Sequence, residues 1–481
     1  MSGATAAGRR RSFRRTARIP RTSPSTEGRP RPARRAAFWG WRVVAAGALT
    51  QTLISGLIQH AYASYSVLLR EEFAWSTTLI ALGFAMTRLE SGLVGPLQGW
   101  MIDRFGPRVV MRIGAVVLWV GMMLFSTLQN EIQFLIYYLV VALGASLAGF
   151  LTVVTAVVGW FERRRSGALA LAQAGFPVGG VLLPIVVYSL TEFGWRPTAF
   201  VSGWICLVAV LALSTVMHAN PAAVGQQVDG GPPPTIEKPQ TDDRPHHNTR
   251  NDTHDTAGEG DGAGAAAVER VHDPVAGGPI KDFTLGEAVR TRTFWTLNFG
   301  HAAALLVVGS TMAHLAIYLT EEQGFTLTQA GFLGSALLLT QLVGQMGGGW
   351  LGDRYPKRRL VIGAMVGHVL GMLLFTFAVA PWMVWAFVPF HGLAWGVRGP
   401  LMQAMRADYF GASSFGKIMG WSSLIIMLGT MSGPLVVGVL RDMTGSYTAG
   451  FTVVTVGASM AAGFFLLSTR PRHPSQMSID G

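Results

Sequence analysis

Residues 43–69 read VVAAGALTQTLISGLIQHAYASYSVLL and contain no Lys, Arg, Asp or Glu. About 20 helical residues cross the ~30 Å apolar core of a bilayer, so an uncharged stretch of this length is typical of a membrane-spanning helix. The whole chain of 481 residues has the same character, because it is 50% hydrophobic and only 13% charged. Ordinary soluble proteins carry about 25% charged residues. The sequence therefore predicts an all-α polytopic membrane protein.

Eleven further apolar stretches follow along the chain. Together with the first they predict twelve transmembrane helices, at residues 41–68, 77–100, 109–128, 132–160, 167–190, 197–217, 294–318, 327–350, 360–379, 382–405, 414–439 and 447–468. We assign each span to a helix because backbone exposed to lipid must satisfy its hydrogen bonds within its own segment. Gly and Pro inside several spans are compatible with this assignment, since small residues permit close helix contact in membranes.

The basic residues support this number of spans. If both termini are cytoplasmic, the cytoplasmic segments, counted together with the basic residues at the adjoining span ends, hold 33 of the 38 Lys and Arg residues, the external loops hold three, and two lie deep within the spans. Cytoplasmic loops are enriched in Lys and Arg. Topology thus explains the net charge of +12, and we expect the lipid bilayer rather than nucleic acid as a partner. The single cysteine, Cys206, excludes an intrachain disulfide.

A polar segment divides the chain into two halves. The expected order is an Arg-rich disordered cytoplasmic tail (1–39), an N-terminal six-helix bundle (40–217), a mostly disordered cytoplasmic linker (218–293), a C-terminal six-helix bundle (294–469) and a cytoplasmic tail (470–481). The linker is rich in Gly, Pro, Asp and Thr, so it cannot bury enough apolar surface to offset its ordering entropy. We interpret four of its histidines, at positions 246, 247, 254 and 272, as solvated side chains and expect no metal.

The Arg-rich start has two alternative interpretations, a twin-arginine export signal and an organelle transit peptide. No separate apolar stretch with a cleavage site follows it, and four prolines between residues 20 and 32 would break an amphipathic helix. We therefore expect a tail that fixes topology.

The two halves repeat one another. The run GWMIDR at 99–104 recurs 250 residues later as GWLGDR at 349–354, and GMMLF at 121–125 recurs at the same offset as GMLLF at 371–375. Matches at one offset indicate two homologous six-helix bundles. Parallel repeats with a substrate site at their interface are an architecture of secondary transporters.

These features resemble the major facilitator superfamily, and the resemblance covers residues 39–469. Its most specific element is the loop after the second span, where residues 99–108 read Gly-x-x-x-Asp-Arg-x-Gly-Pro-Arg. The charged run at 353–359 is similar to the weaker copy found in the second half of the family. The resemblance implies a 6+6 helix fold and alternating access.

A finer resemblance points to the monocarboxylate porter and oxalate:formate antiporter branch, whose members carry small organic anions. It rests on Gly-Trp-Arg at 40–42, the run WFERRR at 160–165 and Gly-Pro at 433–434. The branch often places a basic residue in span 8, where this sequence has Gln341 and Gln345 instead.

The loop signature predicts a gate. Asp103 and Asp353 end spans 2 and 8, within reach of basic neighbours and of the positive N-terminal ends of adjacent helices. We expect these two aspartates, with Arg104, Arg108 and Arg354, to hold one conformation shut. The alternative is that they only fix topology and loop geometry.

Three charges within the spans are the main candidates for binding and coupling, because such charges usually face a cavity. Arg398 in span 10 and Arg88 in span 2 suit a substrate carboxylate, since a guanidinium fork binds two oxygens. Structural or snorkelling arginines are the alternative. Glu90 is the proton-coupling candidate, with a structural ion pair as the alternative.

Uncharged polar residues in the spans extend this candidate site. Gln51, His301, Gln341 and Gln345 are expected to line a polar cavity and bind substrate, although hydrogen bonds between helices are the other interpretation.

The sequence contains no ATP-binding GxxxxGK[ST], no HExxH and no GxSxG, so we expect neither an enzyme nor a cofactor. The resulting prediction is a secondary active transporter for a small organic anion, a carboxylate, by proton symport or anion exchange in a bacterial cytoplasmic (inner) membrane. One alternative is a proton-coupled exporter of amphiphilic or cationic compounds. Another is a non-transporting membrane sensor or scaffold, for which the linker and tail show no signalling module.

Overall fold

The computed structural model describes residues 38–231 and 282–474, and every regular element within these ranges is helical. The expected Arg-rich tail, most of the linker with the histidines at 246, 247, 254 and 272, and the end of the C-terminal tail lie outside the described residues.

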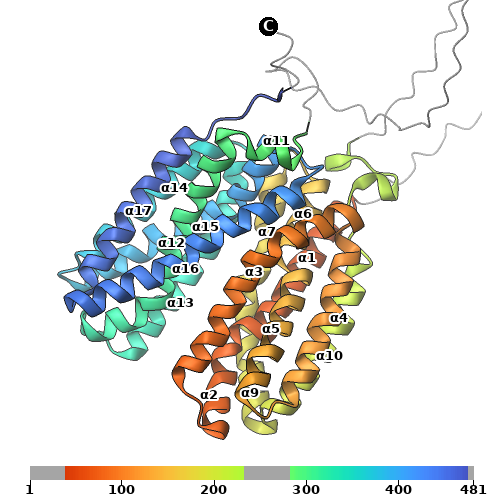
Figure 1. Ribbon diagram of the computed structural model, residues 1–481. Coiled ribbons are helices and arrows are strands. Elements are labelled where there is room, and N and C mark those ends of the chain that lie inside the picture. The colour runs from red at the N-terminus through yellow and green to blue at the C-terminus, as the bar shows by residue number, and fades with distance from the viewer. Residues whose placement is uncertain (1–37, 232–281, 475–481) are drawn as a thin grey trace, which may run out of the picture. The chain divides into compact units, whose positions relative to one another are not determined.

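Helices of the first half occupy the positions of its six expected spans (Figure 1). They are α1 (Gly40–Ile54), η1 (Ser55–His60), α2 (Tyr62–Phe73), α3 (Thr77–Phe105), α4 (Pro107–Ser126), α5 (Glu131–Ala148), α6 (Phe150–Trp160), α7 (Arg165–Gln173), α8 (Gly175–Gly179), η2 (Gly180–Leu182), α9 (Leu183–Phe193) and α10 (Trp195–Ser214). Two short turns, η3 (Pro221–Val224) and η4 (Val228–Gly230), follow before the described chain breaks off.

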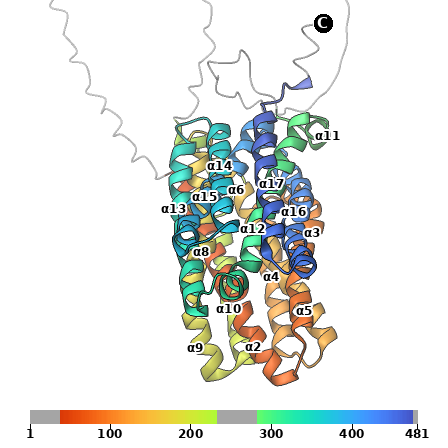
Figure 2. The same ribbon diagram turned by 90° about the vertical axis from the view of Figure 1, so that its left-hand side faces the viewer.

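The second half is simpler, with one long helix for each expected span. After the short α11 (Leu285–Val289) come α12 (Arg292–Glu321), α13 (Leu327–Gly352), α14 (Lys357–Thr376), α15 (Pro381–Phe410), α16 (Phe415–Thr444) and α17 (Tyr447–Leu467). In both views α11 lies at one end of the helices, whereas α2 and α9 lie at the other (Figure 1 and Figure 2).

Nine helical segments of the described chain are long and apolar enough to cross a membrane. The three remaining expected spans coincide with the long helices α3, α13 and α15. The protein is therefore an integral, multi-pass membrane protein.

Local sequence explains where the helices begin. Gly106 adopts a φ of 81° that ends α3, and Pro107 occupies the first position of α4, where its missing N–H is not needed. The side chain of Asn130 caps α5 by accepting a hydrogen bond from Gln133 N. Thr326 forms a capping box with Gln329 at the start of α13.

Each half has its own apolar core. Trp160, Phe134 and Phe161 are almost fully buried in the first, and Phe375 and Phe451 are fully buried in the second. Four buried residues of the second half pack into the first core and so join the two bundles. They are Ala404, Ala407, Phe415 and Met419.

Glycines bring the two halves into backbone contact. A Cβ added at Gly99 of α3 would lie 2.1 Å from Gly416 O of α16, and one at Gly420 would lie 2.2 Å from Gly95 O. A side chain at these positions would force the helices apart. We call the end of the helices that carries Gly416, Asp103 and Asp353 the linker end, because the described ends of the linker contact the loops there.

Candidate functional site

Close packing between α13 and α15 places the central polar residues of the second half. A Cβ at Gly396 of α15 would lie 2.0 Å from Gln341 O and 2.5 Å from Gln345 N. Gly348 of α13 approaches Val397 Cα in the same way. The glycines therefore set the helix separation at which Gln341 and Gln345 stand beside the segment of α15 that carries Arg398.

Arg398 lies inside the second bundle. It is 1% exposed, and its Nε and Nη1 atoms have no hydrogen-bond partner in the part of the chain that the structure describes. Its electrostatic neighbours include His301, His368 and His391. A buried cation whose donors lack acceptors is costly unless a counter-charge is supplied.

The structure describes a single buried carboxylate, and it lies in the first half. Glu90 on α3 is 6% exposed, its Oε2 accepts a hydrogen bond from Ser91 Oγ at 3.4 Å, and its Oε1 has no partner among the described residues. No buried Asp or Glu within the described residues of α12–α17 therefore compensates Arg398.

Arg406, eight residues beyond Arg398, is also fully buried but is held by neutral partners. Its Nη2 donates to Asn298 Oδ1 at 2.8 Å and to His301 Nδ1 at 2.9 Å, and its Nη1 donates to Gln403 Oε1 at 3.2 Å. The expected tenth span ended at residue 405, whereas α15 continues to Phe410 and therefore includes Arg406. His301 thus contacts an arginine that sequence reasoning missed.

Two histidines form a buried pair next to this cluster. His368 Nδ1 of α14 lies 3.2 Å from His391 Nδ1 of α15, both side chains are 0% exposed, and neither Nε2 has a described partner. One ring must donate and the other accept across this contact. The pair was not recognisable from sequence, because its members belong to different spans.

Helix α7 connects the two halves at this level. Gln345 of α13 donates to Ala170 O at 2.8 Å, and Gln51 of α1 donates to Ala172 O at 3.4 Å. Gln173 at the end of α7 lies against Gly399, and its Nε2 is buried without a described partner. Gln51 and Gln345 therefore contact one helix, and Gln173 joins the candidates as a residue that sequence reasoning missed.

Arg88 is placed differently from Arg398. It is an exposed residue of α3 and interacts electrostatically with Tyr138 of α5 in the first bundle. Glycines on the same face of α3, Gly92 and Gly95, pack against Met427 and Ser423 of α16.

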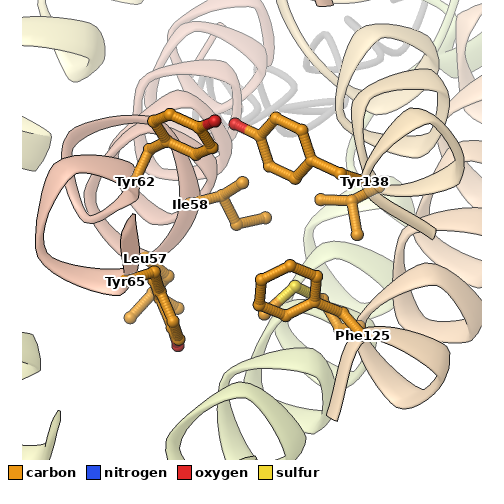
Figure 3. Close-up of a pocket in the computed structure, with 8 residues that line it drawn as sticks. Leu57, Ile58, Tyr62, Tyr65, Phe125 and Tyr138 are labelled. Atoms are coloured by element: carbon orange, nitrogen blue, oxygen red, sulfur yellow. The ribbon is translucent and has the colours of Figure 1, made fainter. Parts of the chain in front are cut away.

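A small pocket lies within the first bundle, between η1, α2, α4 and α5. Figure 3 shows the hydroxyl groups of Tyr62 and Tyr138 pointing toward one another across it. Its volume is about 10 Å³, which is room for about one water molecule. It is too small to hold an organic solute.

The two motif aspartates bind helix N-termini across the bundle interface. Asp103 of α3 accepts hydrogen bonds from the backbone N–H groups of Gly416 and Lys417, at 3.0 and 2.9 Å, in the first turn of α16. The positive end of a helix dipole stabilises a carboxylate in this position.

Asp353 repeats the arrangement in the other direction. It accepts from Ser166 N at 2.8 Å and Gly167 N at 3.0 Å in the first turn of α7. Asp353 lies just beyond the end of α13, where burial raises the pKa of its carboxyl while the two N–H groups act to lower it. The two contacts are related by the 250-residue repeat.

The arginines of the motif do not contact these aspartates. Arg108 donates to Ser214 O and Thr215 O at the end of α10, Arg354 stacks on Trp350, and Arg104 is exposed. Arg108 therefore holds helices of one bundle together.

An ion pair without a counterpart in the repeat also links the bundles. Arg165 of α7 lies 2.5 Å from Asp408 Oδ1 of α15, and Lys357 lies 2.8 Å from Asp408 Oδ2. The linker end is thus closed by two helix-capping contacts and one ion-pair network.

Comparison with known proteins shows which family this chain resembles in sequence. The model of the Major Facilitator Superfamily matches residues 47–313 and 297–479. Monocarboxylate transporter 13 of Bos taurus is 25% identical over 443 residues, which cover 90% of this chain and 89% of that protein. Human monocarboxylate transporter 11 is 25% identical over 476 residues, covering 94% and 87%.

Among solved structures, the human organic anion transporter MFSD10 (TETRAN) has the same fold. The TM-score is 0.61 at 15% identity, and the match covers 89% of this chain and 99% of that one. The expected superfamily and the expected likeness to monocarboxylate transporters are both confirmed, and so is the expectation that the chain is not an enzyme.

Proposed function

The chain belongs to the major facilitator superfamily, and we propose that it is a secondary active transporter which moves a small organic anion, a carboxylate, by alternating access. The proposal rests on the surroundings of Arg398, a buried arginine whose Nε and Nη1 have no partner among the described residues. A carboxylate supplies both the missing charge and two acceptor oxygens. The names of the relatives, monocarboxylate transporters, support the same class of substrate.

Residues around Arg398 complete the proposed binding site. Gln341 has a buried Oε1 without a described partner, and Gln345 reaches α7 of the other bundle. His301 lies at the edge of the same region, where it contacts Arg406. Gln51 lies at another edge, where it contacts α7. Solvent does not reach Arg398 in this conformation, so the anion reaches it only when the surrounding helices move.

Coupling requires a second ion or a counter-substrate. We assign proton binding to Glu90, because it is the one buried carboxylate among the described residues and has an oxygen free to carry a proton. Arg88, two residues away on α3, interacts electrostatically with Tyr138 of the first bundle and is assigned a secondary part in attracting the anion. Proton symport and anion exchange both fit this arrangement.

Gating falls to Asp103 and Asp353. Each holds a helix N-terminus of the opposite bundle, so both contacts must break when the bundles separate at the linker end. The excess of Lys and Arg at this end supports a cytoplasmic location for it, in accordance with the positive-inside rule. We further infer that the membrane is the bacterial cytoplasmic membrane and that each half, 40–217 and 294–469, moves as one bundle.

Ligand-induced thermal stabilisation of the purified protein tests the anion site. Small mono- and dicarboxylates should raise the unfolding temperature of the wild type. Arg398→Lys should weaken the apparent affinity and Arg398→Ala should lower it about tenfold to a hundredfold, the effect of losing a charge-assisted hydrogen-bonded pair. Arg70→Ala is the matched control, because Arg70 is an exposed arginine at the opposite end. Stabilisation by cationic amphiphiles alone, or unchanged affinity in Arg398→Ala, would contradict the proposal and favour the exporter.

A further inference from the structure

Two aspartates at the described ends of the linker contact the loops that precede α7 and α16, the two helices whose N-termini hold Asp353 and Asp103. Asp229, in η4, accepts hydrogen bonds through Oδ2 from Arg163 N at 2.7 Å and from Glu162 N at 3.2 Å. Asp282, at the other end of the linker, accepts through Oδ2 from Ser413 N at 3.0 Å. The two aspartates thus hold backbone groups of the two halves in the same way.

The contacted residues occupy equivalent places in the repeat. Arg163 lies two residues before Arg165, the first residue of α7, and Ser413 lies two residues before Phe415, the first residue of α16. The helix turns that follow are those that hold Asp353 and Asp103. Each linker aspartate therefore holds a loop residue that lies three positions before a backbone N–H that binds a motif aspartate.

Local geometry shows that these contacts are specific. Asp229 has a φ of 57°, a left-handed conformation that non-glycine residues adopt rarely and Asp more readily than most. Gly411 has a φ of 86°, and a Cβ at this position would lie 2.1 Å from Asp282 Oδ1. The backbone thus adopts unusual conformations that allow each carboxylate to reach its loop.

Neighbouring contacts hold the two aspartates in place. Phe283 N donates to Phe410 O at 2.9 Å, and the two phenyl rings pack edge to face. On the other side, Gly230 packs against Phe38, whose ring contacts Phe161. The linker ends are therefore docked on the bundles rather than merely leaving them.

We infer that Asp229 and Asp282 are positioning residues for the gate: each orients a helix N-terminus, of α7 and α16 respectively, to receive the motif aspartate of the opposite bundle. Loss of either carboxylate loosens its loop and weakens the closed linker end. Through these contacts, changes in the linker alter the equilibrium between the closed and open states of the linker end. The inference rests on the proposed gating by Asp103 and Asp353.

Distances between spin labels on the two bundles test this inference in the full-length protein. The labels are placed at exposed positions of opposite bundles at the linker end, Phe105→Cys and Tyr355→Cys, in a Cys206→Ala background. The parent should show mainly the short distance. Asp229→Ala and Asp282→Ala should each shift the ratio of short to long distances about three- to tenfold towards the long one. Asp442→Ala, an exposed acid at the far end of α16, should leave the ratio unchanged.

A second comparison separates positioning from general destabilisation. In an Asp103→Asn background, Asp282→Ala should add no further shift, because both act on α16, whereas Asp229→Ala should still add its own. Should an alanine variant fail to purify, Asp229→Asn and Asp282→Asn, which each keep one acceptor oxygen, should give the same pattern with smaller shifts.

Unchanged distances in Asp229→Ala and Asp282→Ala would overturn the inference, and so would equal shifts from Asp282→Ala with and without Asp103→Asn. If Asp103→Asn and Asp353→Asn themselves leave the distances unchanged, it is the proposed gate that fails.

Discussion

Arg398 and Arg406 are both buried on α15, yet their surroundings differ in the one respect that matters for binding. Arg406 directs its donors at the oxygens of Asn298 and Gln403 and at His301, so it needs no further partner. Arg398 keeps Nε and Nη1 without a described acceptor. A buried donor left unsatisfied costs about 1–3 kcal/mol, and more when it is charged. Arg398 is therefore the arginine that gains from an incoming anion.

Glu90 gives a prediction at the same scale. Glu90→Gln keeps the size of the side chain but carries neither charge nor exchangeable carboxyl proton. If Glu90 couples protons, the variant should lose accumulation driven by a pH gradient while exchange of labelled for unlabelled anion continues at a rate within about threefold of the wild type. Measuring both fluxes in one proteoliposome preparation checks this. A variant that still accumulates anion in response to the pH gradient would remove Glu90 from the coupling step.

The charged residues of the site were accessible from sequence, and their partners were not. Glu90 and Arg398 stand out because charges are rare in apolar spans. His368 and Gln173 are ordinary polar residues in the sequence, and they become candidates only because tertiary packing buries them. Whether Arg88 and Arg398 share one site was equally beyond the sequence, since it depends on how α3 and α15 are rotated.

Among the elements, α13 and α15 show how helix packing fixes the site. Gly396 and Gly348 bring the two backbones together, and this contact places Gln341 and Gln345 beside the arginine segment. Helix α15 also contains Pro389 and Pro400, which leave carbonyl groups of the preceding turns without their usual helical partner. The glycines thus set the distance between the two helices, and this distance determines where the polar side chains lie.

Gly396→Val tests this role of packing. A valine side chain would collide with Gln341 O, and overpacking of this kind costs about 1–3 kcal/mol. The variant should unfold at a lower temperature and lose carboxylate-induced stabilisation. Gly363→Ala on α14 is the matched control, because a Cβ there meets nothing within 4 Å, and it should leave both quantities close to the wild-type values. Wild-type stability and ligand response in Gly396→Val would show that the α13–α15 contact is not required.

At this scale the sequence located every helix of the described chain except the short ones. Each expected span coincides to within a few residues with one helix or with a run of consecutive helices, apart from extensions such as that of α15 to Phe410. The division of span 5 into α7, α8, η2 and α9 was not predicted, although Pro177 marks it. The π-helical turn η1 in span 1 has no local signal in the sequence, and it lies where Gly56 packs closely against Gly179.

The whole molecule is built on a repeat with one asymmetry. Asp103 and Asp353 are related by the 250-residue offset, and so are Arg108 and Arg358, which cap the ends of α10 and α17. The pair Arg165–Asp408 has no equivalent, because Phe415 and Val158 occupy the positions at this offset. The repeat therefore relates the symmetric contacts to one another but gives no indication of the asymmetric one.

Uptake of labelled carboxylates into proteoliposomes is the measurement that bears most directly on the proposed transport. The purified wild type should accumulate at least one small carboxylate when a proton gradient or a trapped counter-anion is imposed. Arg398→Ala, inserted in equal amount, should fall to the level of protein-free vesicles, and Arg398→Lys should retain partial uptake with weaker apparent affinity. The account is contradicted if Arg398→Ala transports at the wild-type rate, or if cationic amphiphiles are moved while no carboxylate is taken up under either gradient.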